Sequence, residues 1–367
     1  MKASPRDITT GAFAPKLLAM AGVALLAALP TAQAFAAEIP LPTISVGAGM
    51  RSSFTHTSVD GAAEDPNDFN LNSARLYLGG TVNDYIKFTL NTEYDNADSK
   101  VQVIDAIARF EFSPQVNIWA GRFLPPSDRA NLNGPYYSNE WGFATEGVQD
   151  GFPFFAAGRD NGVAYWGDFE KLKVSAGFFD VPSTTGDSKV VSAARVQYDF
   201  WDAEPGYYLN GTYYGEKNIL ALGASTQLVS GDNAYTIDGI MEKKLAGGGV
   251  VTLSAEYAKY DGFGGYGVSV PFTKSDGYFG LASYLFPTTV GVGKLQGKFQ
   301  ILGKYASSSY DAGGPSIGRN TAEVDVNYII KAFNARLSLF YIDTSFDDAP
   351  PSEVDSKQIG LGLQIQI

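Results

Sequence analysis

The chain has 367 residues, with no cysteine, one histidine, 41 glycines, 13% aromatic residues and a formal net charge of −12. The lack of cysteine excludes disulfide frameworks, thiolate metal centres and cysteine nucleophiles, and the acidic balance excludes nucleic acid as a partner, because phosphate backbones require a basic surface. A mean hydropathy of −0.07 fits a soluble protein, but it also fits a transmembrane β-barrel, in which every second strand residue faces water.

The first residues have the pattern of an export signal. Lys2, Arg6 and Lys16 precede the apolar run 17–29, and residues 32–34 or 34–36 fit an A-x-A cleavage site. The apolar run is shorter than the ~20 residues that a helical span needs, which disfavours the alternative of an N-terminal membrane anchor. We therefore expect a signal peptide at residues 1–34. Removing it, with its net charge of +2, would leave −14 on residues 35–367.

From Thr43 onward, short segments alternate apolar and polar residues and are separated by clusters of Gly, Pro, Asn, Asp and Ser. This spacing is typical of an all-β sandwich or barrel. Seventeen segments fit the pattern: 43–56, 69–81, 85–95, 101–112, one that starts at 116, 160–169, 172–181, 189–200, 207–214, 219–229, 235–245, 250–260, 276–286, 295–305, 321–330, 333–344 and 357–367.

An odd number of strands conflicts with a single-chain barrel whose two ends lie on the same side of a membrane. The long loops 123–160, 261–274, 307–319 and 345–356 all fall on one side only if one segment between Trp201 and Ile219 does not span. Segment 207–214 is short and is flanked by glycine, so we exclude it from the membrane-spanning strands. The sequence then predicts a sixteen-stranded antiparallel transmembrane β-barrel.

The width of such a ring distinguishes it from the alternative, a secreted soluble β-protein. Sixteen strands enclose more space than side chains can fill, so the centre must be wet and the apolar faces must meet lipid. The polar faces carry too many charges for a dry core. We expect the following residues to line the lumen: Arg75, Lys87, Asp105, Arg195, Lys298 and Arg336.

The loop at 123–160 is far longer than usual connections, and it is too aromatic for disorder. We expect this third outer loop to fold into the lumen and to narrow the pore. The candidate constriction residues are Arg109, Arg122, Asp128, Arg129, Tyr136, Tyr137, Trp141, Glu146 and Arg159. The alternatives are that the loop aromatics only pack the loop itself, and that Arg109 and Arg122 only pair with Glu111 or Asp105 on the wall.

Several of these stretches together resemble a known family. Residues 103–126 (VIDAIARFEFSPQVNIWAGRFLPP) and 158–167 (GRDNGVAYWG), with 75–80, 211–223 and the last strand, resemble the phosphate-selective porin O and P family. The resemblance implies a sixteen-stranded outer-membrane barrel, often trimeric, whose third outer loop dips into the lumen. Two features depart from the family: the expected lumen arginines and lysines are mixed with carboxylates, and the chain ends in Ile367 where an aromatic residue is common.

The function that follows is passive, weakly selective diffusion of small hydrophilic solutes or ions across a bacterial outer membrane, with a weak cation preference from the excess of carboxylates. We expect a homotrimer in contact with lipid and lipopolysaccharide, and no metal or cofactor. The alternatives are an anion-selective or phosphate-selective channel, as in the resembled family, and a structural or electron-conduit barrel around a partner protein. An enzyme is not expected, because His56 is the only imidazole and no G-x-S-x-G motif accompanies it.

Overall fold

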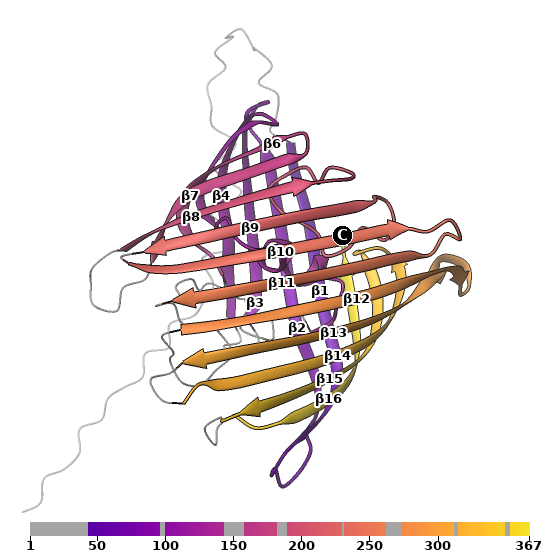
Figure 1. Ribbon diagram of the computed structural model, residues 1–367. Helices are drawn as coiled ribbons and strands as arrows, with labels where there is room; N and C mark the ends of the chain where they lie inside the picture. Colours follow the sequence, from indigo (N-terminus) through magenta and orange to yellow (C-terminus); the bar gives the residue numbers. More distant parts are fainter. Residues whose placement is uncertain are drawn as a thin grey trace, which may run out of the picture. The chain divides into compact units, whose positions relative to one another are not determined.

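The computed structural model describes residues 43–95, 100–142, 158–181, 189–229, 231–261, 274–311, 315–348 and 353–367. In these residues the chain forms sixteen antiparallel strands that close into a barrel, and strands adjacent in sequence are adjacent in the ring (Figure 1). The predicted strand number and fold class are therefore confirmed. The predicted signal peptide lies outside the described residues, as does Glu146.

The strands are β1 (Thr43–Val59), β2 (Asn67–Thr81), β3 (Ile86–Asp95), β4 (Lys100–Ser113), β5 (Val116–Phe123), β6 (Asp160–Phe169), β7 (Leu172–Val181), β8 (Lys189–Asp199), β9 (Ile219–Val229), β10 (Asp232–Lys244), β11 (Val250–Asp261), β12 (Lys274–Val290), β13 (Gly297–Asp311), β14 (Ile317–Lys331), β15 (Ala335–Asp347) and β16 (Ser356–Gln366). The helices in the described residues are α1 (Arg129–Tyr137) and the 3-10 turn η2 (Gly293–Leu295). None of the described helices has the length and apolar character needed to cross a membrane.

The first and last strands close the ring. Strand β1 pairs with β16 from Gly49 opposite Gln366 to Val59 opposite Ser356, so the described sheet has no open edge that would need water or another chain. The alternation in β16 is the one predicted: Gln364 is buried, whereas the neighbouring Ile365 is 44% exposed. Polar side chains thus face inward and apolar side chains face outward.

The outward face of the sheet is apolar on strand after strand. Val324 on β14, Leu339 on β15 and Leu361 on β16 are each half exposed. Aromatic pairs lie towards one end of the barrel, among them Tyr198 with Phe200 near the end of β8 and Tyr284 with Phe286 in the second half of β12. A band of exposed apolar side chains with aromatic residues at its rim is typical of a barrel surface that contacts lipid.

One predicted strand face is wrong. The period of two in the predicted strand 101–112 puts Ile104 on the apolar, outward face with Ala106, but Ile104 is 3% exposed and Val103 is 45% exposed. The register of β3 and β4 shifts between Asn91 and Thr92, so Ile104 has no partner of its own. A β-bulge of this kind adds one residue to a strand and reverses the faces before it.

The connections at one end of the barrel are short, as at 82–85, 114–115 and 170–171. The connection from β8 to β9 at the same end occupies residues 200–218 and is called here the β8–β9 connection. Backbone hydrogen bonds from Phe200 to Leu220 and from Asp202 to Asn218 extend the hairpin, and the chain then leaves the sheet. The prediction that 207–214 does not form a strand is confirmed.

Candidate pore and constriction site

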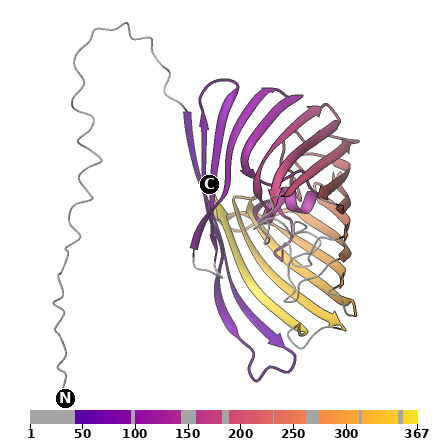
Figure 2. The ribbon, with the colours of Figure 1, turned by 90° about the vertical axis from the view of Figure 1, so that its left-hand side faces the viewer.

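The residues that follow β5, 124–142, are called here the α1 segment. Helix α1 begins after Asp128, whose carboxylate caps it by accepting a hydrogen bond from the Asn131 backbone N–H at 2.8 Å. Gly134, at φ +64°, breaks the helix before Pro135, a conformation that glycine adopts without strain. Figure 2 shows this short helix amid the strands.

The second half of the α1 segment is held by β14 and β15. Arg336, which is fully buried, donates hydrogen bonds to the backbone carbonyls of Ser138, Asn139 and Glu140 at 3.1, 2.8 and 3.0 Å. The Asp325 carboxylate accepts a hydrogen bond from the backbone N–H of Trp141 at 2.8 Å. Strand side chains thus satisfy the polar backbone of an irregular segment, which would otherwise be costly to bury.

Trp141 extends these contacts to β1, β15 and β16. Its ring stacks on Phe340 with centroids 5.4 Å apart, and the Arg51 guanidinium lies 4.3 Å from its centroid. Gly362 on β16 faces the same ring, and a Cβ atom there would lie 2.5 Å from it. Only glycine leaves room for the indole at this position.

We therefore expect Gly362→Ala to displace Trp141 and to lower the stability of the folded barrel by about 1–3 kcal/mol, the usual cost of overpacking. The measurement is the urea midpoint of the refolded protein. Gly303→Ala is the matched control, because a Cβ atom at Gly303 would meet nothing within 4 Å. An equal loss of stability in both variants would contradict the role assigned to Gly362.

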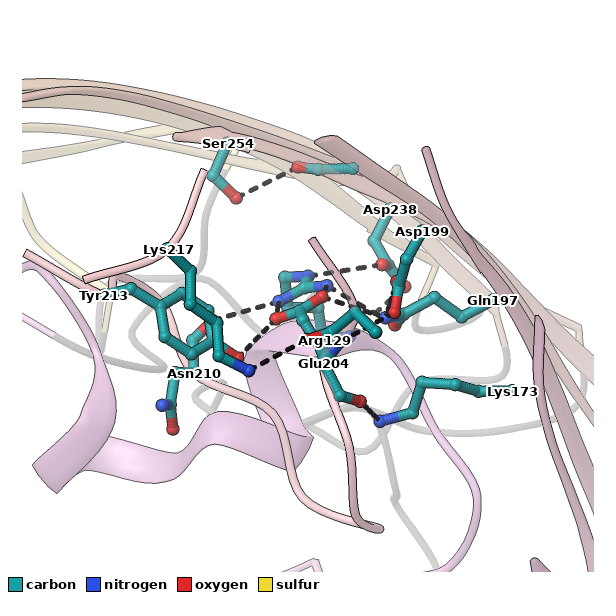
Figure 3. Close-up of polar contacts among 12 residues, drawn as sticks. Arg129, Lys173, Gln197, Asp199, Glu204, Asn210, Tyr213, Lys217, Asp238 and Ser254 are labelled. Atoms are coloured by element: carbon teal, nitrogen blue, oxygen red, sulfur yellow. Dashed lines mark hydrogen bonds and ion pairs between the residues drawn. The ribbon is translucent and has the colours of Figure 1, made fainter. Parts of the chain in front are cut away.

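The first half of the α1 segment is held by Arg129. Its guanidinium forms an ion pair with Glu204 of the β8–β9 connection at 2.5 Å and lies 3.8 Å from Asp238 on β10. Asp238 is also paired with Arg195 on β8 at 2.5 Å. Figure 3 shows Arg129, Glu204 and Asp238 converging with Gln197 of β8. All of these groups are buried, so the charges compensate one another without water.

The Arg129–Glu204 pair predicts an acid transition. Burial alone would raise the pKa of Glu204, but Arg129 outweighs it and lowers this pKa from 4.5 to about 2. A lowered pKa in the folded state means that the pair stabilises the site above about pH 4.5 and is lost as the pH falls towards 2. We expect the α1 segment to stay docked from about pH 8 to 5 and to loosen only below that range, as followed by the tryptophan fluorescence of the refolded protein. A transition centred near neutral pH would contradict this.

The strands β2 to β4 border a cavity of about 250 Å³. These strands contribute Arg75, Tyr77, Asn91 and Asp105, and the remaining lining residues are Leu124, Leu132, Asn133, Gly134, Tyr137, Arg159, Tyr208, Leu209 and Asn210. The α1 segment and the β8–β9 connection therefore form one wall of this cavity, and the barrel forms the other.

The charges around this cavity are arranged as pairs. Arg75 bonds Glu93, and the Arg159 Nε atom lies 3.0 Å from an Asp105 oxygen. Further along the same wall Lys87 and Arg109 share Glu111, at 2.8 and 2.6 Å, and Arg122 lies 3.6 Å from Asp160. Cations and carboxylates thus alternate on this wall, and neither sign forms a continuous row.

The structure separates the predicted constriction residues into three groups. Asp128, Arg129, Tyr136 and Trp141 are buried between the α1 segment and the strands. Tyr137 and Arg159 line the cavity. Arg109 is on the wall and pairs with Glu111, as the alternative interpretation held, whereas Arg122 pairs with Asp160 instead of Asp105.

The predicted lumen residues also fall into groups, according to whether they lie near the cavity or against the α1 segment. Arg75, Lys87 and Asp105 lie on the half of the ring that borders or adjoins the cavity, whereas Arg195 and Arg336 are buried against the α1 segment. Lys298, near the start of β13, is half buried and on the same face as Gln300.

Sequence reasoning missed the residues of the β8–β9 connection, above all Glu204 and Tyr208. A signal was present, because residues 207–214 are richer in aromatic residues than the long loop and the connection is much longer than others at its end of the barrel. The described residues contain no group of three or more His, Asp or Glu placed to hold a metal ion.

Comparison with known proteins finds similarity in structure alone. No protein family model matches the chain, and no curated protein matches it. The anion-selective porin from Comamonas acidovorans has a TM-score of 0.59 at 14% identity, over 89% of this chain and 100% of that one. OmpF of Salmonella typhi has a TM-score of 0.59 at 12% identity, over 88% and 97%. The trimer form of OmpT, an outer membrane protein of Vibrio cholerae, has a TM-score of 0.53 at 12% identity, over 89% and 99%.

The barrel has the porin fold. At these identities the likeness concerns the fold, and it extends over nearly the whole length of each neighbour. The membership of the phosphate-selective porin O and P family that the sequence suggested is not established by these matches.

Proposed function

We propose that the protein is an outer-membrane porin through which small hydrophilic solutes or ions diffuse passively. One observation carries this proposal: a closed ring of sixteen strands, within the described residues, has apolar side chains outside and polar side chains inside. Such a surface is stable only in lipid, and such an interior only in contact with water or polar groups.

The α1 segment is the proposed constriction. Its hydrogen bonds reach the polar faces of β1, β8, β10, β11, β12, β13, β14, β15, β16 and also β2. A segment that bonds to strands on opposite sides of a closed ring supports our proposal that it folds into the lumen. The cavity beside β2–β4 is the proposed passage, since most of these hydrogen bonds hold the segment against the remaining strands.

The proposed passage is weakly selective. The cation preference expected from the sequence rested on an excess of carboxylates, but many carboxylates are buried against the α1 segment or the β8–β9 connection, among them Asp238, Glu242, Glu256, Glu323 and Asp325. The charges that border the passage are paired. Selectivity in a channel follows the charges that line it, so we propose a small preference at most for either sign.

Planar-bilayer recording of the refolded protein tests both statements. We expect discrete conductance steps and reversal potentials close to zero in a salt gradient. The absence of steps would contradict the channel, whereas a strong phosphate preference would contradict only the weak selectivity and would favour the resembled family.

We also propose that the protein is a homotrimer in the bacterial outer membrane, in contact with lipopolysaccharide. The resemblance of the sequence and the trimer form of OmpT support this. Chemical crosslinking of the protein in outer-membrane vesicles tests it, with a single monomeric band as the contrary result. A non-enzymatic role fits the porin fold of the barrel.

A further inference from the structure

The β8–β9 connection enters the site from the end of the barrel opposite to the loop that carries α1. Tyr207, Leu209 and Thr212 of this connection are buried. Strand residues hold it in place: Glu242 on β10 accepts hydrogen bonds from the Thr212 hydroxyl and the Tyr213 backbone N–H, at 2.6 and 2.9 Å. The connection is therefore fixed to the wall and is not merely a long turn.

The connection also bonds directly to the α1 segment. The Tyr207 hydroxyl donates to the carbonyl of Leu124 at 2.8 Å, and the backbone N–H of Leu209 donates to the carbonyl of Leu132 at 3.3 Å. Further along, the Gly211 N–H donates to the carbonyl of Tyr137 at 2.9 Å. With the Arg129–Glu204 ion pair, these bonds join the two segments from one end of α1 to the other.

An apolar cluster completes this junction. Trp119 and Phe123 of β5, at inward positions where polar side chains would be expected, pack with Leu132, Tyr207 and Leu209 in one buried group. The Trp119 and Tyr207 rings lie 4.8 Å apart. Burial of these side chains favours the docked arrangement by the hydrophobic effect, and the ion pair fixes its register.

We infer that the β8–β9 connection sets the width of the passage, and that Glu204 is the positioning residue through which it does so. Glu204 holds Arg129, and with it the first half of α1, against β8 and β10. Tyr208 of the same connection lines the cavity. A shift of the connection would therefore move two parts of the cavity wall, the one formed by α1 and the one formed by the connection itself. This inference rests on the proposed channel function.

The first test compares Glu204→Gln with the wild type by single-channel recording. Glutamine keeps the shape of the side chain but removes the charge that holds Arg129. We expect a unit conductance higher by roughly a half and more open-channel noise, because conductance follows the free cross-section at the constriction. Tyr207→Phe, which removes only the bond to Leu124, should change noise in the same direction. Glu216→Gln is the matched control, because Glu216 is exposed on the same connection.

A crosslink provides the rescue. The chain has no cysteine, so Leu132→Cys with Leu209→Cys introduces a single possible disulfide across the junction. In the Glu204→Gln background, oxidation should restore wild-type conductance, and reduction should abolish the restoration.

The outcomes separate the two proposals. If the wild type shows no steps, the channel function is contradicted. If the wild type conducts and both Glu204→Gln and Tyr207→Phe behave as Glu216→Gln does, the inference is overturned. It is also overturned if the cysteine pair does not crosslink, or if the crosslinked channel stays wide. Heat-modifiable electrophoretic mobility confirms that each variant retains its folded barrel.

Discussion

Replacing Arg336 by alanine is expected to release the second half of the α1 segment and to widen the channel. The change leaves the carbonyls of Ser138, Asn139 and Glu140 without their common donor. Buried acceptors without partners are costly, so we expect a loss of stability on the order of 3 kcal/mol or more. Unit conductance should rise on the order of twofold if the released segment moves out of the lumen. Urea unfolding and single-channel recording measure the two effects.

Two further variants test whether the effect of Arg336→Ala comes from the lost hydrogen bonds to the α1 segment. Arg336→Lys keeps the charge but loses the planar fork that reaches three acceptors, so it should lie between alanine and the wild type. Arg319→Ala is the control on the adjacent strand. The Arg319 guanidinium lies over the ring of Phe346 on β15, which is not part of the α1 segment. A stable Arg336→Ala barrel with wild-type conductance would show that this anchor does not hold the segment.

Breaking the Asp105–Arg159 pair is expected to change ion selectivity in opposite directions, depending on which partner is lost. Asp105→Asn removes the negative charge that faces Arg159 and should favour anions. Arg159→Gln should favour cations. Each should alter the permeability ratio by roughly twofold to threefold, because a fixed charge acts strongly at a narrow passage. Reversal potentials in a salt gradient measure the ratio.

The sign of the change is the decisive observation here. Lys274→Gln, at an exposed ion pair with Asp261 at the end of its strand, is the control and should leave the ratio nearly unchanged. If Asp105→Asn and Arg159→Gln shift the reversal potential in the same direction, or not at all, the cavity beside β2–β4 is not the route of the ions.

The fold followed closely from the sequence where a strand alternates cleanly. The predicted bounds of β6, β7 and β9 are those observed, and Ile365 and Gln364 of β16 face as predicted. The bounds and faces of strands were predicted less well where apolar and polar residues do not alternate regularly. Strand β13 continues through residues 306–311, which include three consecutive serines, beyond its predicted end, and the bulge at Ile104 reverses a face without changing composition.

The site was less predictable, for a physical reason. The nature of the long loop could be read from its aromatic residues, but the partners that fix it lie far along the chain, as Arg336 lies 198 residues after Ser138. No local pattern records such a pairing. The interpretation that placed 207–214 outside the sheet was right, yet it did not reveal that Tyr207 and Leu209 pack on α1.

The pairing of β1 with β16, and the bonds from β14–β16 to the α1 segment, carry a consequence for biogenesis. Gln364 donates to the carbonyl of Tyr136 across 228 residues of sequence, so this contact forms only after the C-terminal strand has taken its place. Contacts between such distant residues form late in folding. A nascent barrel that still lacks its final strands would hold an undocked α1 segment. Its permeability to solutes would reach the native value only after β16 has paired with β1.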